Sequence, residues 1–203
     1  MPTTNPRPNR PQAVPRLGQP PPPRVAAAAP FQRSVIRESR AIWGLDAPIP
    51  VIGAQFQQES GWRPTICSPY ACGLAQFTPS TAAWISRAYP GSLAGADVFN
   101  PAWAIRALVR YDRHLFDRVP PAATECDQWA FTLSAYNGGL GWVARDAALC
   151  DAAAGCDGRR WFRNVELHSK RSKAAMRENR GYPRRILFNQ EPYTMWGRSI
   201  TCN

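Results

Sequence analysis

With 203 residues, 44% of them hydrophobic, the chain is long enough for one well-packed domain plus a tail. Its formal net charge of +11 favours a polyanionic partner, such as nucleic acid, an anionic surface or an acidic polymer like the cell wall. No apolar run approaches the roughly 18 residues that span a bilayer, and the N-terminus lacks the apolar core of a secretory leader. The sequence therefore predicts neither a membrane span nor a signal peptide.

The first 30 residues differ in composition from the rest of the chain. They hold ten of the 21 prolines and four arginines but no acidic residue, and residues 20–23 are all proline. Such a segment cannot bury a core, so we predict an extended or disordered tail over residues 1–30 and a folded domain over residues 31–203. The tail could be a solvated linker, a tether or a polyanion-binding arm.

Apolar residues at helical spacing dominate the remainder, and little of it alternates with period two. We therefore expect a mainly α fold with little or no sheet. The clearest helix starts are Thr78 and Asn100, each an N-cap residue followed by proline. Helices are predicted near residues 31–43, 50–60, 79–87, 101–118, 129–137, 142–151 and 172–179, with loops at 63–71, 89–97 and 155–163, a break at Tyr182-Pro183 and no clear period in about the last fifteen residues.

The helix over residues 50–60 carries the most informative acidic residue. Ile52 and Phe56 form its apolar face and Gly61 is typical of a C-terminal stop, so Glu59 lies in the last turn. The helix dipole favours cations at that end, and burial of the carboxyl against Trp or Phe would raise its pKa. A carboxylic acid that stays protonated near neutral pH is a proton donor. The alternative is a solvated glutamate at a helix end.

Six cysteines allow three disulfides, with 15 possible pairings. Disulfides are typical of an oxidising compartment, and reduced, buried cysteines are the alternative. The chain has no Cys-x2-Cys pair and only two histidines, so the usual ligand spacing of a zinc site is missing and we predict no metal site. Sequence proximity suggests two local pairs and leaves the third by elimination only: Cys67–Cys72, Cys150–Cys156 and Cys126–Cys202.

Four short motifs follow one another along the predicted domain. Each is weak alone, but helix signals lie in the right places between them. The motifs are Glu59-Ser60, residues 73–82 (GLAQFTPSTA), residues 135–139 (AYNGG) and residues 178–182 (ENRGY). This order resembles the catalytic domain of the soluble lytic transglycosylases, lysozyme-like enzymes that cleave bacterial peptidoglycan. The resemblance covers roughly residues 41–187 and implies a lysozyme-like fold of the goose-type kind.

The resemblance also implies roles for individual residues. Glu59 matches the single catalytic acid/base of the family, and Ser60 is expected to support Glu59 or the substrate. Ala75 stands where Met is usual, which removes an apolar contact but no proton-transfer group, and Pro183 stands where Val is usual. The other matched positions are expected to bind substrate along the sugar cleft: Ser68, Gln76, Tyr136, Asn137, Glu178 and Tyr182.

The chemistry that the resemblance implies needs only one carboxylate, whereas most glycosidases use two. The first three motifs contain no second acid. Neutral Glu59 would protonate the glycosidic oxygen between N-acetylmuramic acid and N-acetylglucosamine, and the substrate's N-acetyl group would stabilise the cationic carbon. The Glu59 carboxylate would then take the proton of the C6 hydroxyl, which gives a 1,6-anhydro sugar without any metal or cofactor.

Two other functions are compatible with the sequence. A goose-type lysozyme-like hydrolase on the same scaffold would leave a reducing-end sugar. A catalytically silent, wall-binding component of a virion or secretion machine would use mainly the basic charge. Residues 159–185 hold ten Lys or Arg against two Glu, and such a flank would raise the encounter rate with an acidic wall.

Partners and location follow from the same observations. The chain shows no recognition-helix motif and no aromatic-rich strand platform, so nucleic acid is not expected as the main partner. We expect peptidoglycan strands as the partner and the periplasm or cell wall as the place of action. Without a signal peptide, a phage tail or virion, or a secretion system, is expected to carry the protein there, with contacts through residues 1–30.

Overall fold

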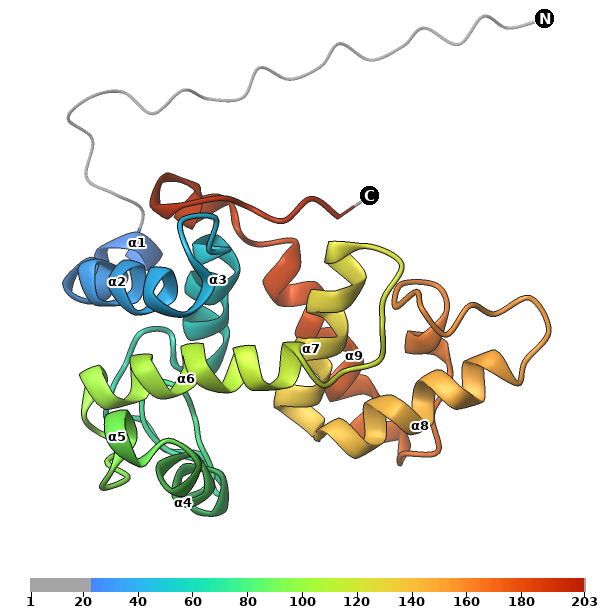
Figure 1. The fold of residues 1–203 in the computed structure, drawn as a ribbon, viewed down its shortest axis with the longest axis horizontal. Coiled ribbons are helices and arrows are strands. Elements are labelled where there is room, and N and C mark those ends of the chain that lie inside the picture. Colours follow the sequence, from blue (N-terminus) through green and yellow to red (C-terminus); the bar gives the residue numbers. More distant parts are fainter. Residues whose placement is uncertain (1–22, 203) are drawn as a thin grey trace, which may run out of the picture.

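Helices and their connecting loops make up residues 23–202, the part of the chain that the computed structural model describes (Figure 1). Extended pairing in this part is limited to isolated bridges of Cys72 with Cys67 and with Phe77. The mainly α fold predicted from the sequence is therefore confirmed. The elements are α1 (Pro23–Ala28), η1 (Ala29–Phe31), α2 (Gln32–Trp43), α3 (Ile49–Ser60), α4 (Pro79–Ala88), α5 (Pro90–Leu93), α6 (Pro101–Phe116), α7 (Glu125–Gly138), α8 (Leu140–Asp151), η2 (Val165–Leu167), α9 (Lys173–Leu187) and η3 (Glu191–Trp196).

Side-chain caps begin two helices at the predicted positions. The hydroxyl oxygen of Thr78 accepts a hydrogen bond from the Thr81 N–H at 3.1 Å at the start of α4. The side-chain oxygen of Asn100 accepts from the N–H groups of Ala102 and Trp103 at 2.9 and 3.3 Å at the start of α6. These bonds satisfy amides that the first helical turn leaves unpaired, so local sequence is sufficient to place both starts.

The predicted tail is too long at its C-terminal end. Residues 23–31 form α1 and η1, and Ala28 is buried in the core. Four consecutive alanines at positions 26–29 have the highest helix propensity of any residue type, and the nearby prolines masked this signal. The remainder of the predicted tail, residues 1–22, lies outside the described residues.

The predicted break at Pro183 is wrong. α9 continues through Tyr182 and Pro183 to Leu187. Proline inside a helix removes one hydrogen bond at a cost of about 3 kcal/mol, but Pro183, Ile186 and Leu187 are buried, where α9 packs against α7 and α3. Burial of this face compensates for the local penalty. The expected loop over residues 89–97 likewise contains the short helix α5.

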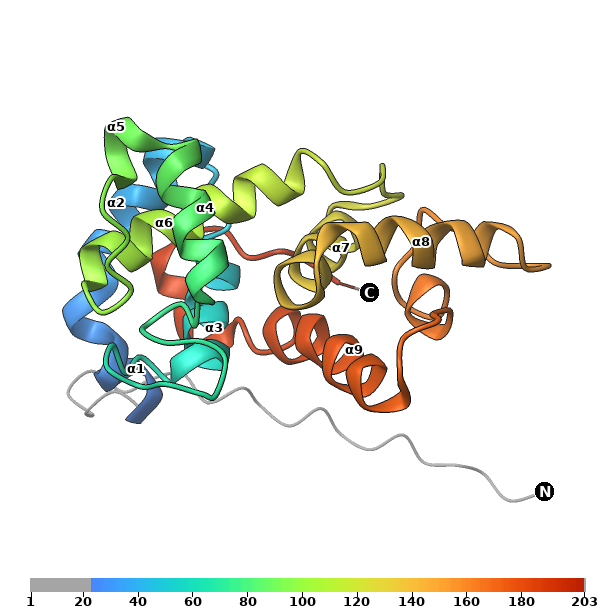
Figure 2. The ribbon, with the colours of Figure 1, turned by 90° about the horizontal axis from the view of Figure 1, so that it is seen from below.

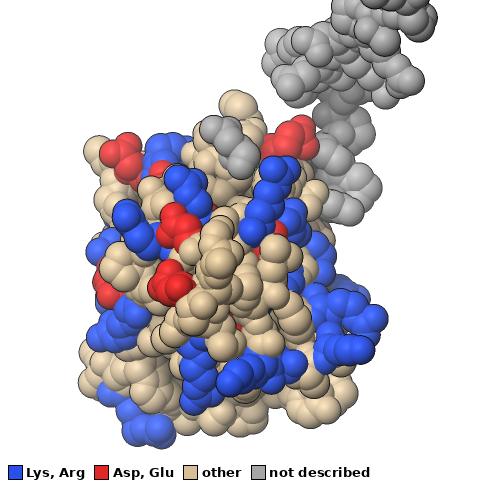
Figure 3. All heavy atoms as spheres, turned by 90° about the vertical axis from the view of Figure 1, so that its right-hand side faces the viewer, with Lys and Arg blue, Asp and Glu red and all other residues tan. Residues whose placement is uncertain are grey.

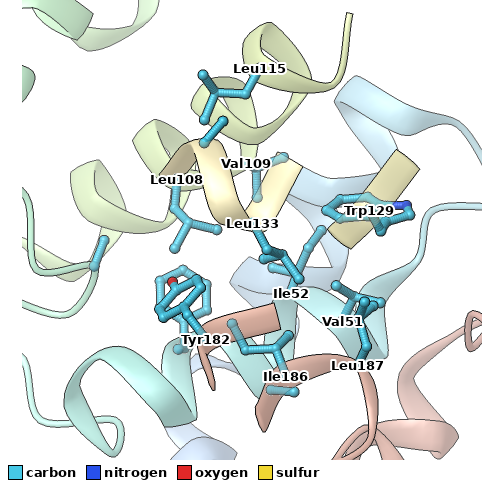
Figure 4. Close-up of a cluster of buried hydrophobic side chains, with 14 of the residues drawn as sticks. Val51, Ile52, Leu108, Val109, Leu115, Trp129, Leu133, Tyr182, Ile186 and Leu187 are labelled. Carbon is cyan, nitrogen blue, oxygen red and sulfur yellow. The ribbon is translucent and has the colours of Figure 1, made fainter. Parts of the chain in front are cut away.

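α3 lies in the centre of the core. Along this helix Ile49, Val51, Ile52 and Phe56 are all fully buried. α3 packs against α2, α9 and η3, and α7 packs against α6, α8 and α9. Figure 4 shows side chains from α3, α6, α7 and α9 meeting in one cluster: Val51, Ile52, Leu108, Val109, Leu115, Trp129, Leu133, Tyr182, Ile186 and Leu187.

The C-terminal segment, which has no sequence period, is held against α3. Tyr193 of η3 covers Gly53, where a Cβ atom would lie 2.7 Å from the Tyr193 ring. The Trp62 indole N–H donates a hydrogen bond to the Tyr193 hydroxyl at 2.8 Å, and Trp196 packs edge-on against both rings. The small residue at position 53 is therefore needed for the close approach of η3.

The three disulfides expected from sequence proximity and elimination are confirmed. Cys67–Cys72 closes a short loop after α3, and Cys150–Cys156 closes another after α8. Cys126–Cys202 joins the first turn of α7 to the end of the described chain. Within residues 23–202, every helix is too short or too polar to cross a bilayer.

The helices form two parts. One part contains α4 and α5, the other contains α8 and α9, and the contact between α6 and α7 joins them. Seen from below, α4 and α5 lie at one end of the molecule and α8 lies at the other, with α9 running along the second part (Figure 2). α3 ends between them, since it contacts both α2 and α9. The last turn of α3 is therefore placed where the two parts meet.

Candidate active site

The end of α3 carries the carboxyl group that the sequence predicted as the acid. Gly61 adopts a φ of +58° as the C-cap, so Glu59 lies in the last turn of the helix, as predicted. Glu59 is partly exposed in a cavity of about 380 Å³. Residues from the loop after α3 and from α4, α6, α7 and α9 line it: Ser68, Tyr70, Ala71, Gln76, Phe77, Thr78, Thr81, Tyr111, Tyr136, Asn137 and Glu178.

The surroundings of Glu59 favour the protonated carboxyl. Burial raises the pKa of Glu59 to about 8, and the negative charge of Glu178 adds to the rise. The Tyr182 hydroxyl donates a hydrogen bond to Oε1 of Glu59, which favours the carboxylate and limits the increase in pKa. Most Glu59 side chains therefore carry a proton at pH 7, as a general acid requires.

Tyrosines provide most of the aromatic surface beside Glu59. The rings of Tyr136 and Tyr182 are stacked, with centroids 6.3 Å apart and an interplanar angle of 7°. The Tyr136 hydroxyl donates to the backbone oxygen of Ala75 at 2.7 Å, which ties α7 to the loop after α3. Of the aromatic residues expected near the carboxyl, Phe77 lines the same cavity, whereas Trp62 packs against Phe56 in the core.

Gln76 is held in an unusual backbone conformation in the loop after α3. Its φ is +48°, and its side-chain nitrogen donates to the backbone oxygens of Ile66 and Gly73 at 3.0 and 2.9 Å. Both amide hydrogens thus stabilise the loop. Gln76 lines the cavity as predicted, and its Oε1 atom is the polar group that it can offer to a bound molecule.

Glycine is required next to this loop. Gly73 has a φ of +81°, and a Cβ atom there would lie 1.9 Å from the backbone oxygen of Val98. Any other residue would push apart the loop and the segment before α6. The glycine that opens the second sequence motif therefore serves to place Gln76.

Three other predicted residues line the same cavity. The Ser68 hydroxyl donates to the backbone oxygen of Ala71 at 3.2 Å and accepts from its N–H at 3.1 Å. Asn137, near the end of α7, accepts a hydrogen bond from Asn179 at 3.1 Å through its side-chain oxygen. Glu178 is exposed on α9 at the cavity edge. The structure therefore brings together side chains from all four sequence motifs and from the loop between the first two.

Two predicted residues occupy positions other than the cavity wall. Ser60 is buried, and its hydroxyl donates to the backbone oxygen of Phe56 at 3.3 Å within α3. Its side chain therefore faces the helix backbone and does not line the cavity. Tyr182 is also buried and lies behind Glu59, to which it donates its hydrogen bond. Its position suits orientation of the carboxyl rather than contact with substrate.

Sequence reasoning missed two tyrosines of the cavity wall. Tyr111 lies on α6, and burial raises the pKa of its hydroxyl. Tyr70 is 81% exposed and is held in the loop that the Cys67–Cys72 disulfide closes. In the sequence, the signal was a tyrosine between two closely spaced cysteines. A disulfide there fixes the position of the aromatic ring, so the ring can bind a partner at little entropic cost.

A buried acid near Glu59 was also missed. Asp112 of α6 is fully buried, and the Gln55 side-chain nitrogen donates to its Oδ1 at 3.2 Å. Burial raises the pKa of Asp112 well above its usual range, and the charge of Glu59 adds to this. Oδ2 of Asp112 and Oε1 of Gln55 have no hydrogen-bond partner among the described residues. A protonated Asp112 carries no charge and has an O–H donor, so protonation lowers the cost of burying these oxygens without partners. In the sequence, the feature that could have identified Asp112 is its position on the apolar face of the helix that became α6.

A possible metal cluster lies elsewhere and lacks competent ligands. The ligand atoms of Cys150, Cys156 and His168 lie within 4.8 Å of one another. The two cysteines are joined in a disulfide, so neither offers a thiolate to a metal ion.

Tyr182→Phe is expected to raise the pKa of Glu59 above its value of about 8. The variant removes the donor that favours the carboxylate, and a hydrogen bond to a charged group contributes about 1.5–3 kcal/mol, which corresponds to tenfold or more in proton affinity. Titration of the carboxyl carbons by ¹³C NMR, with the Glu59 signal assigned from Glu59→Gln, measures the change. Tyr136→Phe is the matched control, because its hydroxyl donates to Ala75 instead. An unchanged or lower pKa in Tyr182→Phe would show that this hydrogen bond is not formed in solution.

Similar sequences are found among enzymes that act on murein. The profile of the family described as Transglycosylase SLT domain matches residues 41–154, which is more than half of the chain. The membrane-bound lytic murein transglycosylase F of two Vibrio cholerae O1 strains is 32% identical over 112 residues, or 55% of this chain. The chain spans only 19% of the length of these relatives.

Solved structures agree in fold. The 70 kDa soluble lytic transglycosylase of Escherichia coli matches with a TM-score of 0.58 and 22% identity, over 81% of this chain and 24% of that one. A complex of the 70 kDa soluble lytic transglycosylase with bulgecin A matches with a TM-score of 0.57 and 23% identity, over 82% and 25% of the two chains. These likenesses confirm the lysozyme-like, all-helical fold. The profile match, which covers more than half of the chain, shows that the chain belongs to the Transglycosylase SLT domain family.

Proposed function

We propose that the protein is a peptidoglycan lytic transglycosylase that cleaves the bond between N-acetylmuramic acid and N-acetylglucosamine and leaves a 1,6-anhydro sugar. The observation that carries this proposal is the position of Glu59, a carboxyl with a pKa of about 8 in a polar cavity of an SLT domain. The names of the related proteins, which are lytic transglycosylases, support the same reaction class.

In the first step Glu59 acts as a general acid. Its proton goes to the oxygen that joins C1 of the muramic acid to C4 of the next sugar, and the C1–O bond breaks. The electron-deficient C1 is stabilised by the N-acetyl oxygen of the same sugar. Tyr182 then stabilises the Glu59 carboxylate through the hydrogen bond that its hydroxyl donates.

In the second step the Glu59 carboxylate acts as a base. It accepts the proton of the C6 hydroxyl, whose oxygen closes onto C1 as the stabilising N-acetyl oxygen leaves. The ring closure gives the 1,6-anhydro product, returns Glu59 to its protonated form and consumes no water. This route uses one carboxylate and requires no metal or cofactor.

The cavity wall supplies groups that suit a sugar. Gln76 presents an acceptor oxygen, and Asn137 has an amide nitrogen in addition to the oxygen that binds Asn179. Tyr136, Ser68 and Glu178 line the same space. We propose that these five residues bind the glycan around the cleaved bond, and that Ser60 and Tyr182 act only through Glu59.

A hydrolase is the second candidate, and one observation favours it. Glu178 is a second carboxylate that lines the cavity with Glu59 and is exposed to solvent. An inverting glycosidase uses such a second carboxylate to activate water. Asp112 is a poor candidate for this role, because it is fully buried and does not line the cavity.

Mass spectrometry of digested peptidoglycan tests the reaction. Wild-type protein is expected to release fragments that end in anhydro sugars, each lighter by one water than the corresponding hydrolysis product. Glu59→Gln is expected to release neither kind. Glu178→Gln is the discriminating variant: it should still give anhydro products if Glu59 acts alone. Reducing-end products from the wild type, lost in Glu178→Gln, would assign the protein to the hydrolases. The absence of any release would leave a wall-binding function as the better description.

We propose the bacterial cell wall as the place of action and peptidoglycan strands as the partner. Three disulfides are typical of proteins that work in an oxidising compartment, which agrees with this location. The face that carries the α8 end of the molecule shows many Lys and Arg side chains with acidic ones among them (Figure 3). Delivery with a phage virion or through a secretion system stays a prediction from the sequence.

A further inference from the structure

A buried polar pair joins α3 to α6 one helical turn before Glu59. Gln55 of α3 and Asp112 of α6 are both completely buried, and the Gln55 side-chain nitrogen donates a hydrogen bond to Oδ1 of Asp112 at 3.2 Å. In the described part of the chain this is the only side-chain hydrogen bond between the two helices. Ile52 and Leu108, about one turn earlier on each helix, lie in the apolar cluster of Figure 4. The pair is therefore a polar contact in apolar surroundings.

The pair has the atoms for two hydrogen bonds. Oδ2 of Asp112 and Oε1 of Gln55 are buried, and neither accepts a hydrogen bond from any described residue. If Asp112 is ionised, both oxygens are acceptors and neither can satisfy the other. A proton on Oδ2 turns this atom into a donor, and Oε1 of Gln55 is an unpaired acceptor on the amide that already contacts Asp112. A carboxylic acid and a side-chain amide can form two antiparallel hydrogen bonds in this way.

No positive charge compensates a carboxylate at this position. Among the described residues, neither Lys, Arg nor His forms an ion pair with Asp112. An unpaired buried charge is costly, so the protonated form is favoured. Burial accordingly raises the pKa of Asp112 well above its usual range. The titratable groups that interact with Asp112 belong to α3, α6, α7 and α9, and none of them is a cation: Glu59, Tyr111, Tyr136 and Tyr182.

The charged groups at the other contacts of α6 lie away from Asp112. Arg106 pairs with Glu38 of α2 at 3.2 Å, and His114 packs edge-on against Trp84 of α4, with ring centroids 4.7 Å apart. At a helix rotation of about 100° per residue, Arg106 and His114 project from other sides of α6 than Asp112 does. They therefore do not supply the missing positive charge.

The charge state of Asp112 matters for Glu59 because the described residues that line the Glu59 cavity include neither Lys nor Arg, and Glu178 adds a second carboxyl there. Glu59 becomes a carboxylate when it gives up its proton, and a negative charge on Asp112 would oppose this step. Gln55 lies four residues before Glu59, so both side chains project from the same face of α3. A bond from Gln55 to α6 therefore fixes the rotation of the helix that carries Glu59.

We propose that Asp112 and Gln55 form a neutral acid–amide pair, in which Oδ2 of Asp112 carries a proton and donates a hydrogen bond to Oε1 of Gln55. The pair holds α3 in the rotation that directs Glu59 into the cavity, and it keeps the interior next to Glu59 uncharged while Glu59 ionises. Asp112 does not line the cavity, so it is a positioning residue and does not contact the glycan. The catalytic role of the pair rests on the proposed function, whereas the proton on Asp112 does not.

Carboxyl ¹³C NMR of the folded protein tests the charge state without any substrate. One aspartate signal, identified by its loss in Asp112→Asn, is expected to have the chemical shift of a protonated acid at pH 7, where a solvated aspartate is ionised. Asparagine is neutral and offers both an acceptor and a donor to Gln55, so the pKa of Glu59 is expected to stay at about 8 in this variant. A carboxylate signal for Asp112 at pH 7, or a lower pKa of Glu59 in Asp112→Asn, would overturn the proposal.

Cleavage of purified peptidoglycan tests the catalytic part. Asp112→Asn is expected to keep kcat within about twofold of the wild type, because the neutral pair is preserved. Asp112→Leu removes both hydrogen bonds and leaves the Gln55 amide unpaired. This variant is expected to lower kcat about tenfold with KM nearly unchanged, since it alters the position of Glu59 and not the contacts with the glycan.

The outcomes separate the proton, the pair and the proposed reaction. Equal losses of kcat in the two Asp112 variants would show that the acid itself is required and would overturn the neutral pair. Full activity in Asp112→Leu would overturn the positioning role. A wild type that cleaves nothing but shows the protonated Asp112 signal would support the neutral pair and contradict only the proposed function. The NMR measurement uses only the wild type and Asp112→Asn, so it decides the charge state even if Asp112→Leu fails to fold.

Discussion

Replacement of Glu59 by glutamine is expected to lower the rate of glycan cleavage by about a thousandfold or more. General acid catalysis contributes about 10²–10⁴-fold, and here the same group also acts as the base, so its loss affects both steps. Glutamine keeps the size of the side chain and can still accept the Tyr182 hydrogen bond. Release of soluble sugar from purified peptidoglycan measures the rate. A variant that keeps more than about a tenth of the activity would exclude Glu59 as the proton donor.

The pH dependence of the wild type follows from the same group. The proton-donor form of Glu59 is present below its pKa of about 8 and is lost above it, so kcat is expected to fall as the pH rises through this value. Tyr182→Phe should move this alkaline limb upward if the hydrogen bond lowers the pKa as the structure indicates. An alkaline limb near pH 4.5 would show that Glu59 titrates as an ordinary, solvated carboxyl.

Thermal unfolding distinguishes loss of catalysis from loss of fold. Because the pKa of Glu59 is about 8 in the folded protein against an ordinary value of 4.5, the folded state binds the proton more tightly. Its contribution to stability is fully present below about pH 4.5 and is lost as the pH rises through 8. Glutamine does not ionise, so Glu59→Gln is expected to melt at a higher temperature than the wild type at pH 8, and the difference should disappear near pH 4.5. A lower melting temperature at both pH values would mean that the variant is misfolded.

Removal of the Cys126–Cys202 disulfide is expected to lower the free energy of unfolding by roughly 4 kcal/mol, because cross-linking residues 76 positions apart removes a large loop-closure entropy from the unfolded chain. The bond also holds the segment after η3, whose Tyr193 and Trp196 cover α3. In this size range such a loss corresponds to a fall in melting temperature of about 10 °C. Urea unfolding of the Cys126→Ala/Cys202→Ala double variant measures it.

The local disulfides provide the comparison. Cys150 and Cys156 are only 6 residues apart, so the same reasoning predicts a loss of roughly 2 kcal/mol for Cys150→Ala/Cys156→Ala. Both double variants replace one or more buried sulfurs, which makes the packing changes comparable. Equal losses from the two pairs would indicate that packing rather than chain entropy controls the effect. No loss from Cys126→Ala/Cys202→Ala would show that the C-terminal segment is held by its aromatic contacts alone.

Much of the helical framework could be predicted because its signals are local. The side chains of Thr78 and Asn100 accept hydrogen bonds from backbone N–H groups in the first turn of their helices, and Gly61 ends α3. A few neighbouring residues therefore determine each boundary. The prediction failed where packing competes with a local rule. Pro183 should break a helix but is buried within α9, and the C-terminal segment has no period but is held by the close contact of Tyr193 with Gly53.

The site shows the same division. Glu59, Gln76 and Asn137 were predicted from motif order and line one cavity, whereas Ser60, adjacent to Glu59, faces the backbone of its own helix. A motif states which residues follow one another, but the helix rotation of about 100° per residue decides which of them faces the cavity. The buried Asp112 was missed for a related reason, since a single acid on an apolar face has meaning only once its neighbours are known.

By itself, the sequence determined the helical class, the place of Glu59 in a last helical turn, and the set of motifs that the cavity combines. These depend on contacts within a few residues, and short-range geometry is nearly the same in every protein. Only the tertiary structure decided that the Tyr182 hydroxyl reaches Glu59, 123 positions away in the chain, and that the Arg171 guanidinium lies beside Gly138. Such contacts arise from the packing of whole helices, and packing depends on the summed shape of many side chains rather than on any one pattern.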